Sequence, residues 1–418
     1  MNIYRELAPS PRTIMTPGPV EVDPRVLRAM SLPVLGQFDP EFTAIMNETM
    51  EMLRELFQTK NHWAYPVDGT SRSGIEAVLT SIIEPGDRVL IPIYGRFGHL
   101  LHEISDRCGA EVVTLEKEWG TVFEPQEIID AIQNEKPAIV ALVHGETSTG
   151  RVQPLEAIGK ACRELDVLLV VDAVATIGGV PVKTDAWCLD AVIGGTQKCI
   201  SVPAGMAPVT YNDRIEHKIA ARKRVERGLR ASGETDFPNA RPQIQSNYLD
   251  LGQLQDYWSP ARLNHHTEMT SMLYGLHEGL RILLAEGLPA RFERHRLNER
   301  ALVAGLEAMG MSLYGDPSCK MTVVTCVTIP DGIDGESVRA MLLNSFGIEI
   351  ASSFGALKGR IWRIGTMGYS CSMKNVLHLL GAFEGALLRH GAKINAGAAI
   401  AAALDVYEGS AKTAAINA

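Results

Sequence analysis

The sequence lacks the features of an exported or membrane-bound protein. Residues 1–6 contain no apolar segment of the kind found in a signal peptide, and no uncharged apolar run reaches 18 residues. The seven cysteines are odd in number and scattered, without C-x-x-C or Cys/His ligand spacing. These absences argue against a disulfide framework and a zinc finger. We expect a soluble cytoplasmic protein with reduced thiols.

The sequence also lacks an excess of positive charge. Its 40 Lys and Arg residues are outnumbered by 49 Asp and Glu residues, so the formal net charge is −9. This balance gives no excess of basic residues that would attract nucleic acid or an anionic membrane. A function on small molecules is therefore favoured, and the length of 418 residues predicts two or three domains.

Short apolar runs alternate with helical patterns through the first half of the chain. The runs predict strands at 89–92, 111–115, 138–143, 167–171 and 191–193; helical patterns occupy 41–57, 73–83, 97–108, 125–134 and 155–165. Because the strand candidates are apolar throughout, they predict a parallel sheet covered by helices on both faces. Ligands of such sheets bind at the carboxyl ends of the strands.

The rest of the chain predicts an arm, a smaller domain and a tail. Two prolines in Thr-Pro-Gly-Pro disfavour regular pairing in the arm, and helices are expected at 218–230 and 268–286. Strands at 321–329 and 360–364, around a helix at 336–346, indicate a second unit. The expected domains are an arm at 1–20, a large domain at 21–285, a small domain at 286–390 and a tail at 391–418. The alanine-rich tail is expected to form a helix that docks elsewhere or frays.

Two charged residues follow neighbouring apolar runs. Asp172 ends the run at 167–171, and Lys198 follows the run at 191–193 and a Gly-Gly-Thr-Gln segment. An enclosed lysine needs a partner or a lowered pKa, and it can form a Schiff base with an aldehyde. The aspartate can keep a ring nitrogen protonated, with Val174 against one face of the ring. The pair predicts a pyridine-aldehyde cofactor, although a surface lysine and a helix-capping aspartate remain the alternatives.

Other polar candidates are weaker signals. The loop at 68–76 places hydroxyls at a helix start, which suits a phosphate, although a tight turn capped by serine has the same pattern. It is neither G-x-G-x-x-G nor a Walker loop, which counts against a dinucleotide or a nucleoside triphosphate. Phe97 has glycines on both sides and can stack over a ring. Adjacent histidines at 265 and 266 are expected to point apart, and no carboxylate has ligand spacing, so we expect no metal site.

Taken together, these segments resemble the class V aminotransferases of fold type I, of the alanine:glyoxylate and serine:glyoxylate kind. The shared motifs are Thr-Pro-Gly-Pro at 16–19, His-Gly-Glu-Thr-Ser-Thr-Gly at 144–150, Val-Asp-Ala-Val at 171–174, Gly-Thr-Gln-Lys at 195–198 and Trp-Arg-Ile-Gly at 362–365. The resemblance implies pyridoxal 5′-phosphate as cofactor. It also implies an α/β fold with a mostly parallel seven-stranded sheet flanked by helices, and a smaller C-terminal α+β domain. The resemblance further implies a homodimer with active sites at its interface. Whether two dimers pair into a tetramer stays open.

The resemblance also implies a role for each matching residue. Lys198 would be the Schiff-base lysine, Asp172 would contact the pyridinium nitrogen and Arg363 would bind the substrate carboxylate. The remaining expected contacts are Thr70, Ser71, Arg72 and Gln197 with the phosphate, Phe97 and Val174 with the ring faces, Thr147 near the ring hydroxyl, Gly18 with substrate, and Asn264 and Thr267 with the partner subunit's phosphate.

Two positions depart from the usual family pattern. A histidine is replaced by Gln37, and a tyrosine by Asn264; both are carboxamides, whose donor and acceptor match a ureido group. Neutral drift is the alternative. The whole chain is similar to the bacterial (S)-ureidoglycine:glyoxylate aminotransferases of purine (allantoin) catabolism. That similarity implies transfer of the amino group from (S)-ureidoglycine to glyoxylate, giving N-carbamoyl-2-oxoglycine (oxalurate) and glycine.

Three other functions stay open from the sequence. The first is the same chemistry with alanine or serine as the amino donor. The second is a lyase of the cysteine desulfurase kind, for which Cys319 and Cys326 are the candidate thiols, although neither lies in a glycine- and serine-rich loop. The third is a cofactor-binding regulator or scaffold, which would need an appended interaction domain that the sequence does not show.

Overall fold

The computed structural model describes residues 4–230, 232 and 241–416. Its main feature is a seven-stranded sheet in the order β2-β10-β9-β8-β5-β3-β4. The strands are β2 (Trp63–Gly69), β3 (Arg88–Ile93), β4 (Glu111–Glu116), β5 (Ile139–Val143), β8 (Leu168–Asp172), β9 (Ala191–Ile193) and β10 (Gly205–Tyr211). All neighbours are parallel except β10, which is antiparallel to β2 and β9. The mostly parallel sheet is confirmed, whereas neither β2 nor β10 was among the strands predicted from the apolar runs.

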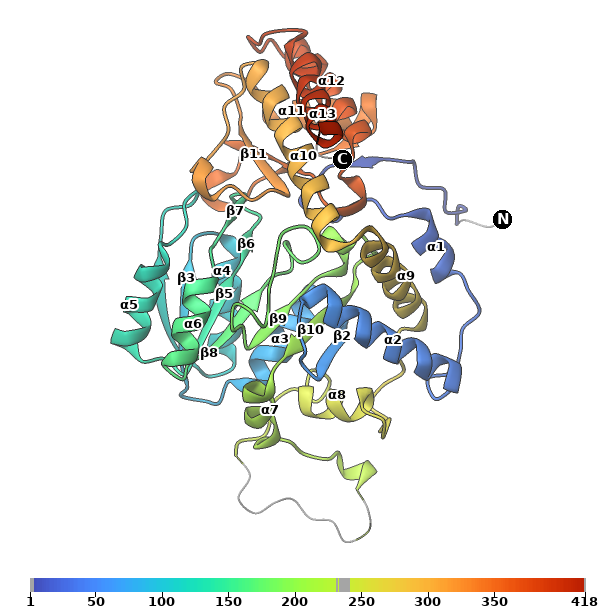
Figure 1. The fold of residues 1–418 in the computed structure, drawn as a ribbon, viewed down its shortest axis with the longest axis vertical. Coiled ribbons are helices and arrows are strands. Elements are labelled where there is room, and N and C mark those ends of the chain that lie inside the picture. Colours follow the sequence, from blue (N-terminus) through green and yellow to red (C-terminus); the bar gives the residue numbers. More distant parts are fainter. Residues whose placement is uncertain (1–3, 231, 233–240, 417–418) are drawn as a thin grey trace.

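Helices flank this sheet (Figure 1). They are α1 (Pro24–Met30), α2 (Pro40–Phe57), α3 (Ser71–Ile82), α4 (Arg96–Arg107), α5 (Pro125–Glu135), α6 (Glu156–Glu164), α7 (Asp213–Ala220), α8 (Leu251–Trp258) and α9 (Thr270–Glu286). Helix α3 packs on β2 and β10, α4 on β3, α6 on β8 and α2 on β2. The central strands are therefore enclosed, as their uninterrupted apolar runs predict.

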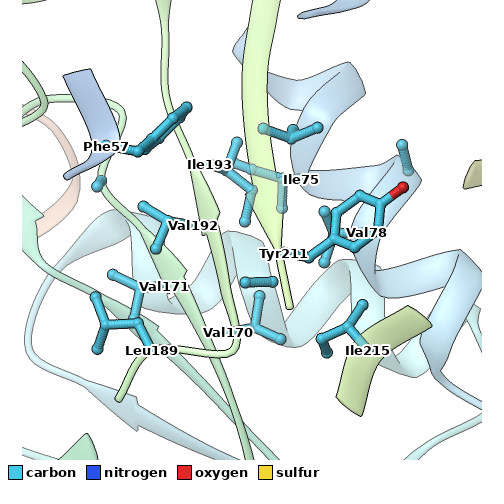
Figure 2. Packing of buried hydrophobic residues seen from close by; sticks show 14 of the residues in the cluster. Phe57, Ile75, Val78, Val170, Val171, Leu189, Val192, Ile193, Tyr211 and Ile215 are labelled. Atoms are coloured by element: carbon cyan, nitrogen blue, oxygen red, sulfur yellow. The ribbon is translucent and has the colours of Figure 1, made fainter. Parts of the chain in front are cut away.

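Close packing on both faces follows from the alternation of side chains along each strand. In Figure 2, Val170 and Ile193 point toward one side of the sheet, where Ile75, Val78, Tyr211 and Ile215 meet them. Val171 and Val192 point toward the opposite side, where Phe57 and Leu189 lie. Every residue of β8 is buried, and its last residue, Asp172, lies at the carboxyl edge of the sheet.

A second unit lies at the top of Figure 1. Its antiparallel sheet has the order β11-β14-β13, with β11 (Val324–Thr328), β13 (Ala351–Ser352) and β14 (Ile361–Gly365). Its helices are α10 (Leu288–Ala308), α11 (Gly335–Phe346), α12 (Met373–Arg389) and α13 (Ala398–Ile416). Trp362 and Phe383 are central to its separate apolar core. The domain boundaries at 20, 285 and 390 stay a prediction.

Two local expectations need correction. The arm is not wholly irregular, because β1 (Thr13–Ile14) pairs with β12 (Ile348–Glu349). No helix covers 218–230: α7 ends at Ala220, and the buried Arg222 side chain turns inward to donate to the carbonyls of Ser81 and Ile83. The tail forms a helix that docks, which is one of the two outcomes expected for it: α13 packs on α10 and α12, with Ala399 and Ala403 buried.

Two further small elements lie near the carboxyl edge of the large sheet. Strands β6 (Gly145–Glu146) and β7 (Arg151–Val152) form a hairpin just after β5. The π-helical turn Thr196–Ile200 follows β9 after two glycines. None of the helices among the described residues is long and apolar enough to cross a membrane.

Candidate active site

Lys198 lies in the short turn that follows β9, close to the N-terminal arm. Its Nζ donates a hydrogen bond to the carbonyl oxygen of Pro17. A Cβ atom on Gly18, whose φ is +100°, would lie 2.4 Å from Lys198 Cδ, so this position requires glycine. Burial lowers the pKa of Lys198 to about 8, and the positive charge of Arg363 acts in the same direction. The amine is therefore closer to its neutral, nucleophilic form than a surface lysine would be.

Asp172 is the last residue of β8 and lies beside Ile193 of β9. Its Oδ1 accepts a hydrogen bond of 2.9 Å from the backbone N–H of Val174. Only 6% of the residue is exposed, and burial raises the pKa of its carboxyl group to about 6. A cationic group placed against Asp172 would favour the ionised carboxylate.

The start of α3 forms the opposite end of the site. Thr70 is the N-cap residue, but its side chain makes no capping hydrogen bond. Gln197 Nε2 lies 2.8 Å from Ser71 Oγ, which joins this helix start to the turn that carries Lys198. The free N–H groups at a helix start attract anions. This end of the site therefore suits a phosphate.

A cavity of about 270 Å³ connects these groups. Its volume is near the lower end of the range for small-ligand pockets. The lining residues are Thr70, Ser71, Arg72, Ile75, Arg96, Phe97, Leu100, Gly145, Thr147, Asp172, Val174, Ala175, Gln197 and Lys198. A neighbouring cavity of about 560 Å³ shares Arg72, Arg96 and Leu100 but contains neither Lys198 nor Asp172. The smaller cavity is the candidate active site because it holds both predicted catalytic residues.

Glu146 is a structural element of the site that the sequence did not single out. Its Oε2 accepts from the Phe97 backbone N–H at 2.8 Å, and its Oε1 accepts from the Ser148 hydroxyl at 2.6 Å. Glu146 is fully buried, and burial raises the pKa of its carboxyl group. The side chain ties the start of α4 to the β6–β7 hairpin and so fixes Phe97 at the cavity. In the sequence, the only indication of a role for Glu146 was its place within the 144–150 motif.

Arg363 reaches the same region from β14 of the second unit. Its Nε donates to the Ser352 carbonyl at 2.8 Å and its Nη1 to the Thr147 carbonyl at 3.1 Å. The guanidinium lies 4.4 Å from the ring centroid of Phe354. These contacts hold the group in one orientation and leave Nη2 without a hydrogen-bond partner among the described residues. Burial lowers the pKa of Arg363 to about 10, which still leaves it charged at neutral pH.

Five predicted residues do not line the cavity that this single chain forms: Gly18, Gln37, Asn264, Thr267 and Arg363. Asn264 and Thr267 are exposed, and Gln37 is half-buried. Gln37 Nε2 donates to Asn264 Oδ1 at 2.9 Å, although the residues are 227 positions apart. The two carboxamides that were singled out separately therefore form a pair. The roles assigned to Gln37, Asn264 and Thr267 stay predictions.

The expected geometry of the adjacent histidines is wrong. His265 and His266 precede α9 in a loop, and their Nδ1 atoms face each other at 2.8 Å. The rings do not point apart, because the loop lacks the helical geometry on which that expectation rested.

Comparison with known proteins identifies the class of this chain. The model of the "Aminotransferase class-V" family matches residues 34–358, so the chain belongs to that family of pyridoxal-phosphate-dependent aminotransferases. This finding confirms the family, the fold and the cofactor predicted from the sequence.

Particular relatives are similar over nearly the whole chain. The (S)-ureidoglycine–glyoxylate transaminase of Bacillus subtilis is 68% identical over 416 residues, which is 100% of each chain. The crystal structure of the B. subtilis ureidoglycine–glyoxylate aminotransferase has a TM-score of 0.91, with 68% identity over 97% of this chain and 100% of that one. An alanine–glyoxylate aminotransferase structure from Nostoc sp. has a TM-score of 0.86, with 38% identity over 92% and 97% of the two chains.

The residues of the cavity fit pyridoxal phosphate. Lys198 would hold its aldehyde end, Asp172 its ring nitrogen, and the start of α3 its phosphate, with Gly18 leaving space for the lysine side chain. When bound, the cofactor supplies an electron-accepting ring that stabilises negative charge at the substrate Cα. The individual contacts of Thr70, Arg72, Phe97, Thr147, Val174 and Gln197 stay predictions, and all six residues line the cavity.

Proposed function

We propose that this protein transfers the amino group of (S)-ureidoglycine to glyoxylate, giving oxalurate and glycine. The observation that carries the proposal is the amide pair formed by Gln37 and Asn264. The similarity to the B. subtilis transaminase of that name supports it over the full chain length.

The amide pair retains unused hydrogen-bonding groups. Gln37 Oε1 is buried without a partner among the described residues. Asn264 Nδ2 likewise donates to no described group, since the pair uses only Asn264 Oδ1. One free acceptor and one free donor match the N–H and C=O of a ureido group. A donor substrate that lacks them would leave polar groups unpaired on binding, which lowers its affinity.

Arg363 and two residues of the cavity divide the reaction between them. Arg363 binds the carboxylate that ureidoglycine and glyoxylate share, using the donor that its contacts to Ser352 and Thr147 leave free. The Lys198 amine takes the proton from the substrate Cα, which its lowered pKa favours. Asp172 holds the ring nitrogen in its protonated form. Both substrates therefore use the same groups in turn, and we expect ping-pong kinetics.

The same proposal includes a cytoplasmic homodimer. Its support is that Gln37, Asn264 and Thr267 do not line the cavity of their own chain. In a symmetric dimer, such a surface edge can complete the active site of the partner subunit. All seven cysteines are free, which suits a reducing compartment. A tetramer would require a second interface, for which we propose nothing.

Product analysis tests the reaction. Freshly generated (S)-ureidoglycine and glyoxylate are incubated with the purified enzyme, and oxalurate and glycine are measured by mass spectrometry. We expect both products in equal amounts. Turnover with alanine or serine that exceeds turnover with ureidoglycine would instead favour the alanine- or serine-donor function.

Mixing of an inactive variant with an impaired one tests the shared site. Lys198→Ala chains are refolded together with chains that carry Asn264→Tyr and Thr267→Ala. In a dimer with shared sites, half of the mixed population has one complete site, so activity should recover to about one quarter of the wild-type value. No recovery, with mixed dimers demonstrated by two affinity tags, would contradict the shared arrangement.

The lyase alternative is disfavoured by its candidate thiols. Cys319 and Cys326 are both buried, and burial raises the pKa of Cys326 to about 11. A persulfide-forming cysteine needs access and a thiolate. The similarity to a cysteine desulfurase from Thermococcus onnurineus, at 17% identity, shows a shared fold alone. Sulfide release from cysteine would overturn this assignment.

A further inference from the structure

A buried cluster of three metal-ligating side chains lies outside the active-site cavity. Asp68, His266 and Glu268 each offer one ligand atom, and these atoms lie within 4.8 Å of one another. Asp68 is the penultimate residue of β2, whereas the other two precede α9. Asp68 and Glu268 are each 4% exposed. The class V chemistry described above uses none of these residues.

The ligand atoms of the cluster retain lone pairs that no well-formed hydrogen bond satisfies. No hydrogen bond of good geometry reaches the carboxylate oxygens of Asp68 and Glu268 or His266 Nε2 among the described residues, although the hydroxyl of Tyr248 lies against Asp68 and that of Tyr257 against Glu268. Two buried carboxylates this close together are costly unless a positive charge or a proton compensates them. The conventional solution inside a protein is a bound proton or a metal ion.

Hydrogen bonding around the histidine pair fixes the orientation of the His266 ring. The Asn247 carbonyl can only accept, so His265 Nε2 donates to it across 3.3 Å. A neutral His265 then has an accepting Nδ1, which receives the Nδ1–H of His266 at 2.8 Å. His266 Nε2 is thereby directed toward the two carboxylates. This is the arrangement of a metal-bound histidine, whose other ring nitrogen donates to an outer partner.

The distances within the cluster fit a small divalent cation. His266 Nε2 lies 3.1 Å from Asp68 Oδ2 and 3.7 Å from Glu268 Oε2. Zinc bonds to nitrogen and oxygen of about 2.0–2.2 Å place two tetrahedral ligands about 3.4 Å apart. The observed separations lie on either side of that value, and a charge of +2 neutralises both carboxylates.

We propose that Asp68, His266 and Glu268 bind one divalent transition-metal cation of the Zn²⁺ or Mn²⁺ class. The ion would join the end of β2, directly before the helix start that suits the phosphate, to the loop that carries Asn264 and Thr267. Its role is therefore structural: it fixes the segment that we propose to contact the partner subunit. The proposal does not depend on which amino donor the enzyme uses.

Metal analysis of the holoenzyme tests the proposal. The protein is purified without chelator, and zinc and manganese are measured by mass spectrometry. We expect about one ion per chain in the wild type and roughly tenfold less in Asp68→Asn and in Glu268→Gln. Retained visible absorption of the bound cofactor shows that each variant is folded. The matched control is Glu48→Gln, which removes the carboxylate of a His277–Glu48 pair, 2.9 Å apart, on the protein surface.

A thermal shift experiment distinguishes the metal from a shared proton. Chelator-treated wild-type holoenzyme is titrated with Zn²⁺ or Mn²⁺ in separate samples. We expect the midpoint of unfolding to rise with one of the two ions in the wild type and in Glu48→Gln, and not in Glu268→Gln. Absence of stoichiometric metal together with no rise for either ion would overturn the proposal. So would an equal rise in the wild type and in Glu268→Gln.

Discussion

A single chain supplies all of the groups around Lys198, whereas it leaves the surface edge formed by Gln37 and Asn264 with unsatisfied hydrogen-bonding groups. Around Lys198, two units of the same chain supply the amine, the carboxylate and Arg363, and all three are enclosed. The Gln37–Asn264 pair lies at the surface with unused hydrogen-bonding groups. The chemistry of the cofactor is therefore built within one chain. The recognition of the amino donor, as we propose it, depends on how two chains meet.

The largest expected effect comes from removing the amine. Lys198→Ala should lower kcat by about 10⁴-fold or more, because no other described group is placed to take the Cα proton. The visible absorption of the bound cofactor should change at the same time. Steady-state rates and an absorption spectrum measure both. Lys160→Ala, on an exposed lysine of α6, is the control; an unchanged spectrum in Lys198→Ala would contradict the assignment.

Weakening the contact between Arg363 and the substrate carboxylate should have a smaller effect than loss of Lys198. The effect should be the same for both substrates. Arg363→Lys loses the planar guanidinium group, which can donate two parallel hydrogen bonds to a carboxylate. It also loses the hydrogen bonds to the Ser352 and Thr147 carbonyls. A charged hydrogen bond contributes about 1.5–3 kcal/mol, so KM for ureidoglycine and for glyoxylate should each rise about 10- to 100-fold. Arg360→Lys, on an exposed neighbour, should change neither KM. A rise confined to one substrate would rule out a shared carboxylate site.

The amide edge should affect one substrate only. Gln37→His with Asn264→Tyr should lower kcat/KM for ureidoglycine about tenfold, because the ureido group loses its matched donor and acceptor. The KM for glyoxylate should stay the same. Gln133→His with Asn134→Tyr makes the matched change on exposed amides of α5. If donor preference is the same in both double variants, Gln37 and Asn264 do not select the donor.

The smallest expected effect is on stability in the cofactor-free protein. Burial raises the pKa of Asp172 from 3.8 to about 6, so the folded state binds its proton more tightly than the unfolded state. This contribution to stability is complete below pH 4 and is lost as pH rises through about 6. The unfolding midpoint should therefore fall by a few degrees more over that interval in the wild type than in Asp172→Asn. Scanning calorimetry of both proteins measures the difference, and bound cofactor should abolish it.

Much of the active site could be predicted because it follows from local pattern. Asp172 and Lys198 each follow an apolar strand, and parallel neighbouring strands place such residues at one edge. Gly18 belongs to a short motif whose positive φ only glycine adopts readily. Strand β10 was missed because an antiparallel strand that contains proline does not show the expected run. The helix expected at 218–230 failed because buried hydrogen bonds of Arg222 outweigh its local helical preference.

The sequence by itself determined the family and the cofactor and predicted the two residues that would hold it, since these depend on motifs and on residues at strand ends. Only the tertiary structure decided that Glu146 anchors Phe97, that Gln37 meets Asn264, and that Asp68 meets His266 and Glu268. Each of those contacts joins segments far apart in the chain. Their geometry is set by how the helices and loops pack on the sheet, and no local spacing encodes it.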